Sequence, residues 1–290
     1  MTLEQLRIFI AVAERQHLTQ AAGALALTPA AVSASIKGLE ERYGVALFDR
    51  VGRRIELSAA GRAFLAEAKA ALAMARNAER TLSELSGLQR GTLDIHASQT
   101  IASYWLPQLL VKFRQRYPNI KLSLTAGNTR SVAQAVAEGA ADIGFIEGGI
   151  DDPELLVRTV SEDRMVVVVA PDHPWTAQRK PTLADLAEAE WIMREQGSGT
   201  RSAFENAMEA AGVSAGQLKV ALELPSNEAV RAAVASGPYA AVMSALVVAE
   251  QLASGALREV KFAMPPRAFF LLRHRSRKPS MASAALEQLV

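Results

Sequence analysis

Three arginines stand close together in the stretch Arg50-Val51-Gly52-Arg53-Arg54. Gly52 is typical of a turn, and apolar residues on either side of the stretch indicate a pair of short strands. Guanidinium groups at the tip of such a hairpin form charge-assisted hydrogen bonds with phosphate oxygens. The chemistry expected at this turn is therefore the binding of phosphate groups.

A second set of polar residues follows apolar stretches that predict strands, and each member precedes a predicted helix. In α/β domains, ligands bind beyond the carboxyl ends of the strands and against helix N-termini. Hydroxyl and N–H groups in such loops suit a small, anionic ligand, although Glu147 disfavours a dianion unless it pairs with Arg194. The candidate ligand-binding residues are Ser98, Gln99, Thr100, Asn128, Thr129, Glu147, Gly148, Arg194, Ser198, Gly199, Thr200 and Asn227.

Each of these loops also has a purely structural interpretation. Ser98, Ser198 and Ser226 can serve as helix N-caps. Gly197 and Gly199 can serve a turn, and Arg194 can belong to a structural ion pair. The case for a ligand site rests on the convergence of several polar loops.

Other chemistries find little support in the residues. Gly-Ser-Gly-Thr at 197–200 lacks the Gly-Lys-Ser/Thr of a nucleotide-binding loop, and no Gly-x-Ser-x-Gly occurs. The chain has no cysteine, and its four histidines stand far apart in sequence, at positions 17, 96, 173 and 274. We therefore expect no metal, no cofactor and no catalytic activity.

The residues before the arginine-rich turn predict two short helices. Leu18, Ala22 and Leu25 give the first an apolar side, with Leu27 just beyond it. Thr28 is a candidate N-cap for the second, with Pro29 in its first turn. In this second helix Val32, Ile36, Leu39 and Tyr43 form one inward stripe, and Gly44 ends the helix. The pattern is typical of a helix-turn-helix followed by a wing.

The opposite side of the second helix is small and almost uncharged. Such a face fits a DNA major groove about 12 Å wide, which a bulky or acidic face would not. With few long donors, base reading would depend on thymine methyl groups, water and DNA shape. The candidate DNA-binding residues are Thr28, Pro29, Ala30, Ala31, Ser33, Ala34, Lys37, Arg50, Arg53 and Arg54.

This part of the chain resembles the N-terminal domain of LysR-type transcriptional regulators. The resemblance rests on LEQLRIFIAVAE, on LTQAAGALALTPAAVSASIKGLEERYGVALFDR and on GRRIELSAAG, which together span residues 1–60. The family often has Gln or Ser at Pro29, Pro at Ala30 and Arg at Ala34, so this chain departs from it in its recognition helix. The resemblance implies a DNA-binding regulator, dimeric through a linker helix and tetrameric through its effector domains.

A long helix is predicted after Ser58, its candidate N-cap. Apolar residues recur there with alternating spacings of four and three, which is typical of a coiled-coil seam. The seam comprises Phe64, Ala68, Ala71, Ala75, Ala78, Leu82 and Leu85. A surface helix packed on its own domain is the alternative. We prefer a dimerising helix, because a helix-turn-helix needs a partner to read a two-fold site.

Beyond residue 91 predicted strands and helices alternate, which indicates α/β units with mainly parallel sheets. Two such sets, with crossings near 161–163 and 265–267, resemble the type 2 periplasmic-binding-protein fold. The expected fold class is α plus α/β, with a winged helix-turn-helix (1–60), a linker helix (61–88) and a two-lobed effector domain (89–290). The first lobe would comprise about 89–161 and 267–290, and the second about 162–266.

Charge and composition fit this interpretation. The chain has 290 residues and a formal net charge of +2, so its cationic character is local to the wing. An apolar signal segment is not evident at the N-terminus, and we expect a cytoplasmic protein without membrane contact. Its expected partners are double-stranded DNA with a partly palindromic site, a small, anionic effector, RNA polymerase and further copies of itself. The alternative is a two-lobed cytoplasmic solute-binding protein or small-molecule enzyme with an N-terminal oligomerisation segment.

Overall fold

A computed structural model describes residues 1–51, 54–85, 91–176 and 180–290 of the chain. These residues form two compact units, the first built mainly from Met1–Leu85 and the second from Ser86–Ala137 and Ala141–Val290. Within the described ranges, no single helix has both the length and the hydropathy needed to cross a membrane.

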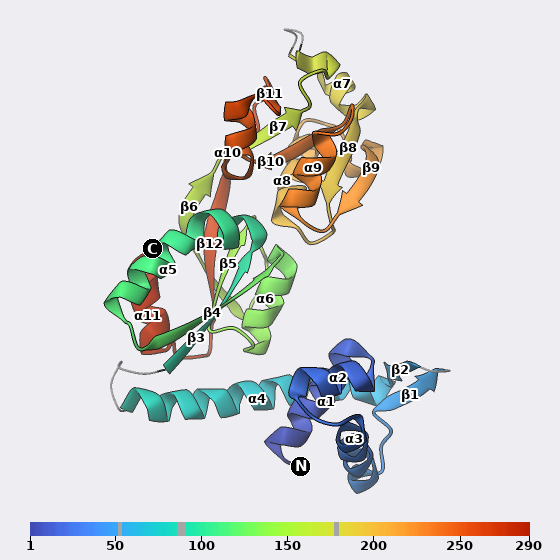
Figure 1. Ribbon diagram of the computed structural model, residues 1–290, viewed down its shortest axis with the longest axis vertical. Coiled ribbons are helices and arrows are strands. Elements are labelled where there is room, and N and C mark those ends of the chain that lie inside the picture. Colours follow the sequence, from blue (N-terminus) through green and yellow to red (C-terminus); the bar gives the residue numbers. More distant parts are fainter. Residues whose placement is uncertain (52–53, 86–90, 177–179) are drawn as a thin grey trace. The chain divides into compact units, whose positions relative to one another are not determined.

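Three short helices form the core of the first unit (Figure 1). They are α1 (Leu3–Arg15), α2 (Leu18–Leu25) and α3 (Pro29–Tyr43). Thr2 and Gln5 form a capping box at the start of α1. Phe9 and Val12 of α1 pack against Val32 and Leu39 of α3 in one apolar cluster. Helices α2 and α3 are bent by 107°, which is the geometry of a helix-turn-helix.

Helix α3 confirms most of the predicted inward stripe but not its last residue. Val32, Ile36 and Leu39 are buried, whereas the Tyr43 side chain is 55% exposed. Gly44 has a φ of +65° and ends the helix, so Tyr43 lies in a final turn that extends past the core. The Arg42 guanidinium lies 5.7 Å from the centre of the Tyr43 ring.

The wing is an antiparallel hairpin of β1 (Phe48–Val51) and β2 (Arg54–Leu57), with Val51 paired to Arg54. Val45, predicted to begin the first strand, lies before it and is exposed. Arg53 and the side chain of Arg54 lie outside the described residues. Helix α4 (Ala59–Leu85) follows, and the Ser58 hydroxyl accepts a hydrogen bond from the Gly61 N–H at 2.9 Å.

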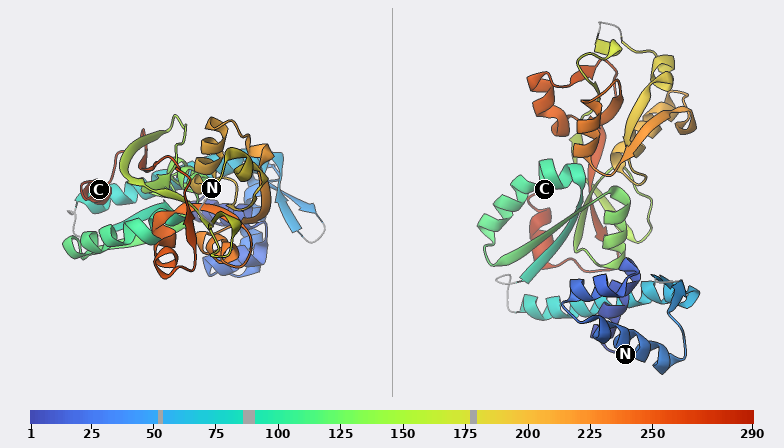
Figure 2. Two further views of the ribbon diagram at one scale, coloured as in Figure 1. Left: turned by 90° about the horizontal axis from the view of Figure 1, so that it is seen from above. Right: turned by 45° about the vertical axis from the view of Figure 1, so that its right-hand side comes forward.

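The first lobe of the second unit is a five-stranded sheet in the order β4-β3-β5-β12-β6. Helices α5 and α11 cover one face and α6 covers the other, as Figures 1 and 2 show. The strands are β3 (Gly91–Ser98), β4 (Ile120–Gly127), β5 (Ile143–Glu147), β6 (Leu155–Asp163) and β12 (Arg267–His274). The helices are α5 (Leu106–Arg116), α6 (Thr129–Glu138) and α11 (Met281–Glu287).

The second lobe has a sheet in the order β11-β7-β10-β8-β9. Helices α7 and α8 pack on one face, and α9 and α10 on the other. The strands are β7 (Met165–Val169), β8 (Glu190–Arg194), β9 (Lys219–Leu224), β10 (Ala240–Ser244) and β11 (Arg258–Val260). The helices are α7 (Leu183–Glu188), α8 (Gly199–Ala210), α9 (Asn227–Val234) and α10 (Ala245–Ser254), with 3₁₀ turns η2 (Pro174–Thr176) and η3 (Ala215–Gln217).

The two-lobed α/β architecture is as predicted, and four of the five strands in each sheet run in the same direction, but one strand in each sheet runs against the others. Strand β12 is antiparallel to both β5 and β6, and β7 is antiparallel to both β10 and β11. The reason is the double crossing between the lobes. The strand that enters the second lobe and the strand that returns from it run against the βα units, so each sheet is mixed.

Two details of the second unit lie beyond what the alternation of strands and helices indicated. The helix after β3 begins as a π-helix, η1 (Ile101–Trp105), and continues as α5 from Leu106. Single-turn π segments are frequent at functional sites. Strand β11 was not predicted, because its three residues are too short for a recognisable alternation.

Candidate functional site

The outer side of α3 is open to solvent at every position predicted to contact DNA. Exposed residues there are Thr28, Pro29, Ala30, Ala31, Ser33, Ala34 and Lys37, and Arg50 is exposed on β1. The Thr28 hydroxyl accepts a hydrogen bond from the Ala31 N–H at 3.2 Å and so caps the helix. Lys37 Nζ lies 3.4 Å from the Glu41 carboxylate, one turn further along. Small side chains thus present backbone and methyl groups at this face.

A carboxylate fixes the wing to this helix. Glu40 Oε1 accepts hydrogen bonds from the backbone N–H groups of Leu47 at 2.7 Å and of Phe48 at 3.2 Å. Gly61 permits the close approach of α4, because a Cβ there would lie 2.0 Å from the Leu47 carbonyl oxygen. The start of the wing is therefore held from two sides. Sequence reasoning missed Glu40, since its partners are backbone groups after the helix.

The second group of predicted residues meets where the two lobes face each other. We call nine of the buried residues there the boundary cluster: Ser98, Thr100, Thr129, Glu147, Asp163, Arg194, Thr200, Asn227 and Arg267. Asn227 Nδ2 donates to the Thr100 hydroxyl at 3.1 Å, across the lobe boundary. The structure thus brings together residues from loops 127 positions apart.

Gln99 and Asn128 add contacts between the lobes at the edge of this cluster. Gln99 Nε2 donates to the Pro225 carbonyl oxygen at 3.0 Å, and its Oε1 accepts from the Asn227 N–H at 3.0 Å. Asn128 Nδ2 donates to Glu195 Oε1 at 3.1 Å. Two residues of the first lobe therefore bind the ends of β8 and β9 in the second.

The start of α8 lies directly against the end of β5. A Cβ on Gly199 would lie 2.0 Å from the Glu147 carbonyl oxygen, so only glycine allows this approach. The Thr129 hydroxyl donates to the same carbonyl at 2.7 Å. Gly148 and Gly197 have φ values of +81° and +89°, so both serve turns. Gly199 thus sets the lobe-to-lobe distance, and Gly197 serves the turn.

The three serines have different roles. Ser226 is an N-cap, whose hydroxyl accepts from the Ala229 N–H at 3.0 Å. Ser198 stands at the N-cap of α8 but makes no side-chain capping bond. Ser98 caps no helix, and its Oγ is buried without a hydrogen-bond partner among the described residues.

Two arginines carry the buried positive charge. Arg194 binds both carboxylate oxygens of Glu195, at 2.7 and 2.9 Å, and donates to Asn227 Oδ1 at 2.6 Å. Arg267 donates to Asp163 and to the Thr200 hydroxyl, the latter at 2.9 Å. The Asp163 carboxylate also accepts from Ser244 Oγ at 2.8 Å.

Glu147 does not form its ion pair with Arg194, as the sequence had suggested, but lies beside Arg267, 3.5 Å from Oε1 to Nη1. Sequence reasoning missed Asp163 and Arg267 because they border the two crossings, 104 positions apart. The sequence did contain one signal for this pair, because each of the two crossings between the lobes has a charged residue beside it.

Burial and ion pairing shift two carboxyl groups in opposite directions. Burial raises the pKa of Glu147, although the nearby Arg267 charge acts against the rise. Burial alone would also raise the pKa of Glu195, but hydrogen bonds from Arg194 and Asn128 hold it below its ordinary value. The predicted roles of all these residues in ligand binding stay predictions.

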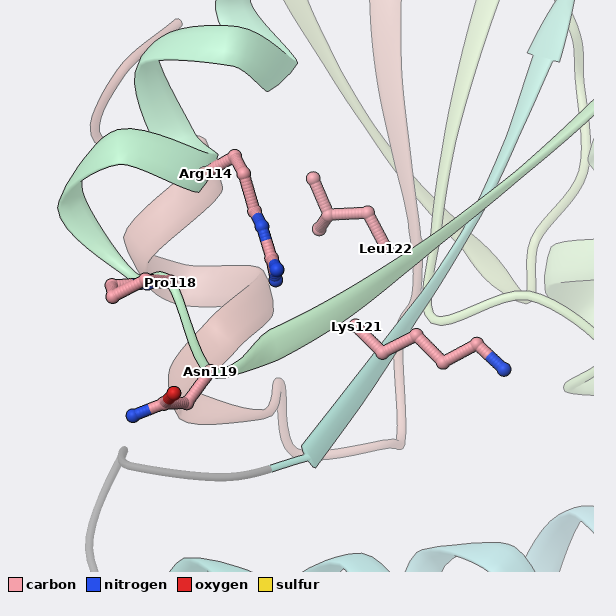
Figure 3. A pocket seen from close by; sticks show the side chains of 5 residues that line it. All are labelled: Arg114, Pro118, Asn119, Lys121 and Leu122. Carbon is pink, nitrogen blue, oxygen red and sulfur yellow. The ribbon is translucent and has the colours of Figure 1, made fainter.

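A surface pocket of about 540 Å³ lies elsewhere in the first lobe, between the end of α5 and the start of β4 (Figure 3). Arg114, Pro118, Asn119, Lys121 and Leu122 line it. None of the predicted site residues belongs to this pocket.

Comparison with known proteins identifies both units. Residues 3–62 match the family described as "Bacterial regulatory helix-turn-helix protein, lysR family", and residues 86–290 match "LysR substrate binding domain". The chain is 37% identical over 284 residues to the uncharacterized HTH-type transcriptional regulator YeiE of Escherichia coli K12, covering 97% of this chain and 94% of YeiE. It is 32% identical over 292 residues to the RuBisCO operon transcriptional regulator of Allochromatium vinosum, covering 100% and 95%.

Two solved structures share the fold. Full-length CbnR complexed with its target DNA has a TM-score of 0.70 and 22% identity, covering 100% of this chain and 99% of CbnR. The regulatory domain of Synechocystis PCC6803 CcmR in complex with 2-PG has a TM-score of 0.62 and 27% identity, covering 69% of this chain and 96% of that domain.

Proposed function

The chain belongs to the LysR family of transcriptional regulators, and we propose that it binds a partly palindromic DNA site through α3 and the wing. The observation that carries this proposal is the exposed, small-residue face of α3 beside the wing, on a helix pair bent by 107°. Family membership favours this regulator over a two-lobed solute-binding protein or an enzyme. The site of action is the cytoplasm, where bacterial DNA lies.

Each part of the head has a separate task in this proposal. Ala30, Ala31 and Ala34 contact thymine methyl groups and Ser33 the base edges, while Lys37 reaches bases or the adjacent backbone. Arg50, Arg53 and Arg54 neutralise phosphates next to the groove. A second copy supplies the other half-site, joined through the part of α4 beyond the core. CbnR, which shares the fold, has been solved with its target DNA.

The boundary cluster is the proposed effector site. It gathers buried hydroxyl, amide and charged groups from both lobes, so a ligand bound there touches both. Such a ligand changes the balance between two arrangements of the lobes, and α4 carries that change to the heads. CcmR, a related regulator, holds 2-PG in its regulatory domain. We expect the effector here to act by binding, without catalysis.

The salt dependence of DNA binding tests the role of the wing. Replacing Arg53 and Arg54 by Ala removes two phosphate contacts from each head, so binding to all sequences should weaken about equally. For the two heads of a dimer, the slope of log K against log salt should fall by roughly 3.6, at about 0.9 for each of the four phosphate contacts. A mobility-shift titration over several salt concentrations measures this slope.

Arg116→Ala is the matched control, since it removes an exposed cation from the end of α5. Its slope should equal that of the unaltered chain. An unchanged slope in the double variant would exclude the wing from the interface.

A further inference from the structure

The boundary cluster and its neighbour Glu195 hold one carboxylate more than they hold cations. Arg194 is matched by Glu195 through two hydrogen bonds, at 2.7 and 2.9 Å. Arg267 is matched by Asp163. Glu147, whose side chain is 3% exposed, is the remaining acid. The charge of each guanidinium is therefore already balanced before an anion enters.

Three buried polar atoms of the cluster have no hydrogen-bond partner among the described residues. They are Ser98 Oγ, Glu147 Oε2 and Arg267 Nε. Buried polar groups are almost always paired in native proteins, so unpaired ones at one place indicate a site for a polar ligand. Ser98 and Arg267 offer an O–H and an N–H donor. Glu147 offers a third donor only when its carboxyl group carries a proton.

The local backbone field favours a negative charge. Helices α6, α8 and α9 begin at Thr129, Gly199 and Asn227, all at the lobe boundary. Each N-terminus carries a partial positive charge of about half a unit. The two ion pairs are neutral, so this field stabilises a single further negative charge, on Glu147 or on a ligand.

The groups that face Glu147 come from several elements. Arg267 on β12, Asp163 on β6 and Arg194 on β8 act on its charge, and the Thr100 hydroxyl before η1 also acts to lower its pKa. Burial is the largest influence and raises the pKa of Glu147. The ionised form is thus the costly one in the ligand-free protein.

We propose that the effector is a small monovalent anion, and that it binds only when Glu147 is a neutral carboxylic acid that donates a hydrogen bond to it. This inference rests on the proposed effector site. The proton on Glu147 comes from water, and the negative charge of the ligand takes the place of the charge that an ionised Glu147 would bring. A dianion is excluded, because no unpaired cation balances its second charge.

Glycolate and oxalate are suitable probes, because they are similar in size but carry one and two negative charges. Their Kd values are measured with the full chain by calorimetry between pH 5 and pH 8. Glycolate should bind at least tenfold more tightly than oxalate at pH 6. Its Kd should rise about tenfold for each pH unit above the point where Glu147 ionises.

Glu147→Gln separates this explanation from a general pH effect. The amide keeps a hydrogen-bond donor and cannot ionise, so the variant should bind glycolate with a Kd independent of pH over this range. Glu250→Gln, at an exposed position on α10, is the matched control and should keep the pH dependence of the unaltered chain. Oxalate binding as tight as glycolate, a pH dependence that survives in Glu147→Gln, or no binding of glycolate would each overturn the proposal.

A measurement without ligand tests the same point. The infrared difference between the unaltered chain and Glu147→Gln, followed from pH 5 upward, should contain the C=O band of a protonated carboxylic acid, and the band should fade over the pH range in which the glycolate Kd rises. Its absence would also overturn the proposal. A dianion that binds and alters the DNA mobility shift would refute the monovalent class and leave the proposed function standing. A full chain that binds glycolate as expected but does not bind DNA would refute only the proposed function.

Discussion

At the scale of single residues, Glu40 links the recognition helix to the wing. Its carboxylate receives two backbone N–H groups, and hydrogen bonds to a charged group contribute about 1.5–3 kcal/mol each. The wing has only a short β-hairpin of its own to define where its arginines lie. Glu40 is therefore a positioning residue for the proposed phosphate contacts of the wing, which it does not itself make.

Replacing Glu40 by Ala should lower the free energy of unfolding by about 3 kcal/mol or more and weaken DNA binding, because two N–H groups lose their acceptor. Glu40→Gln retains an oxygen at this position and should recover most of the DNA affinity. Chemical denaturation and mobility shift measure the two effects. Glu41→Ala, at the exposed neighbour, should change stability by less than about 0.5 kcal/mol. Equal losses in the Ala and Gln variants would contradict the positioning role.

Ala26 is a second residue with a distinct local role. It ends α2 with a φ of +54°, a left-handed conformation that costs a residue with a Cβ about 1–2 kcal/mol. Ala26→Gly should raise the free energy of unfolding by roughly 0.5–1 kcal/mol. Glycine relieves the backbone strain of the folded state, and part of this gain is offset because glycine also increases the conformational entropy of the unfolded chain. Ala24→Gly, within α2, should lower it instead by up to about 1 kcal/mol. Thermal unfolding of both variants gives the comparison, and a loss at both positions would show that Ala26 carries no strain.

At the scale of elements, α4 has two different halves. Phe64 and Ala68 pack into the core of the first unit, although both belong to the predicted seam. Further along, Ala71, Ala78 and Leu82 are exposed, and Leu82 is 70% exposed. The spacing alone could not distinguish these roles, since an amphipathic helix repeats in the same way on its own core and on a partner. Only the second half remains available as a dimer seam.

We expect Ala78→Glu to separate the dimer, because it places like charges against each other in a closely packed seam. Ala70→Glu lies off the seam on the same helix and should leave the dimer intact. Sedimentation velocity of both variants measures the change. A dimer that survives Ala78→Glu would place the contact between copies elsewhere.

The elements also show what local sequence can predict. Thr28 and Gly44 act within a few residues of themselves, and the N-cap and the helix end that they predict are confirmed. The order of strands and helices follows for the same reason. The π-helix at Ile101 and the antiparallel β12 depend on distant partners, and periodicity carries no information on those.

The proposed effector site illustrates the same limit. Loops at the carboxyl ends of strands were predictable because strand polarity places them together. The charge pairing was not, since Asp163 and Arg267 meet only through the two crossings. Arg194 pairs with its chain neighbour Glu195, which leaves Glu147 beside Arg267. These ion pairs determine which charged groups are balanced by a partner. The spacing of residues in the sequence does not predict the pairs.

At the scale of the second unit, the two lobes are held together by a few hydrogen bonds that can be removed singly. Gln99 makes two of them, to the Pro225 carbonyl and from the Asn227 N–H, both at 3.0 Å. Each contributes about 0.5–1.5 kcal/mol. Loss of both bonds, about 1–3 kcal/mol together, shifts an equilibrium between lobe arrangements by roughly fivefold to 150-fold.

Gln99→Ala should therefore shift the lobes toward a more open arrangement. Spin labels, one in each lobe, report the distribution of lobe-to-lobe distances, which should move to longer values. Gln108→Ala, at an exposed position on α5, should leave the distribution unchanged. If Gln99→Ala also left it unchanged, Gln99 would have no part in lobe closure.

The position of strand β12 in its sheet has a consequence for folding during translation. It lies between β5 and β6, although residues 267–274 follow all five strands of the other sheet in the chain. A ribosome delivers the second lobe complete while the first still lacks an inner strand. Nascent chains thus hold the edges of β5 and β6 unpaired until residues 267–274 leave the ribosome, and chains that stop short of this strand become substrates for chaperones or proteolysis.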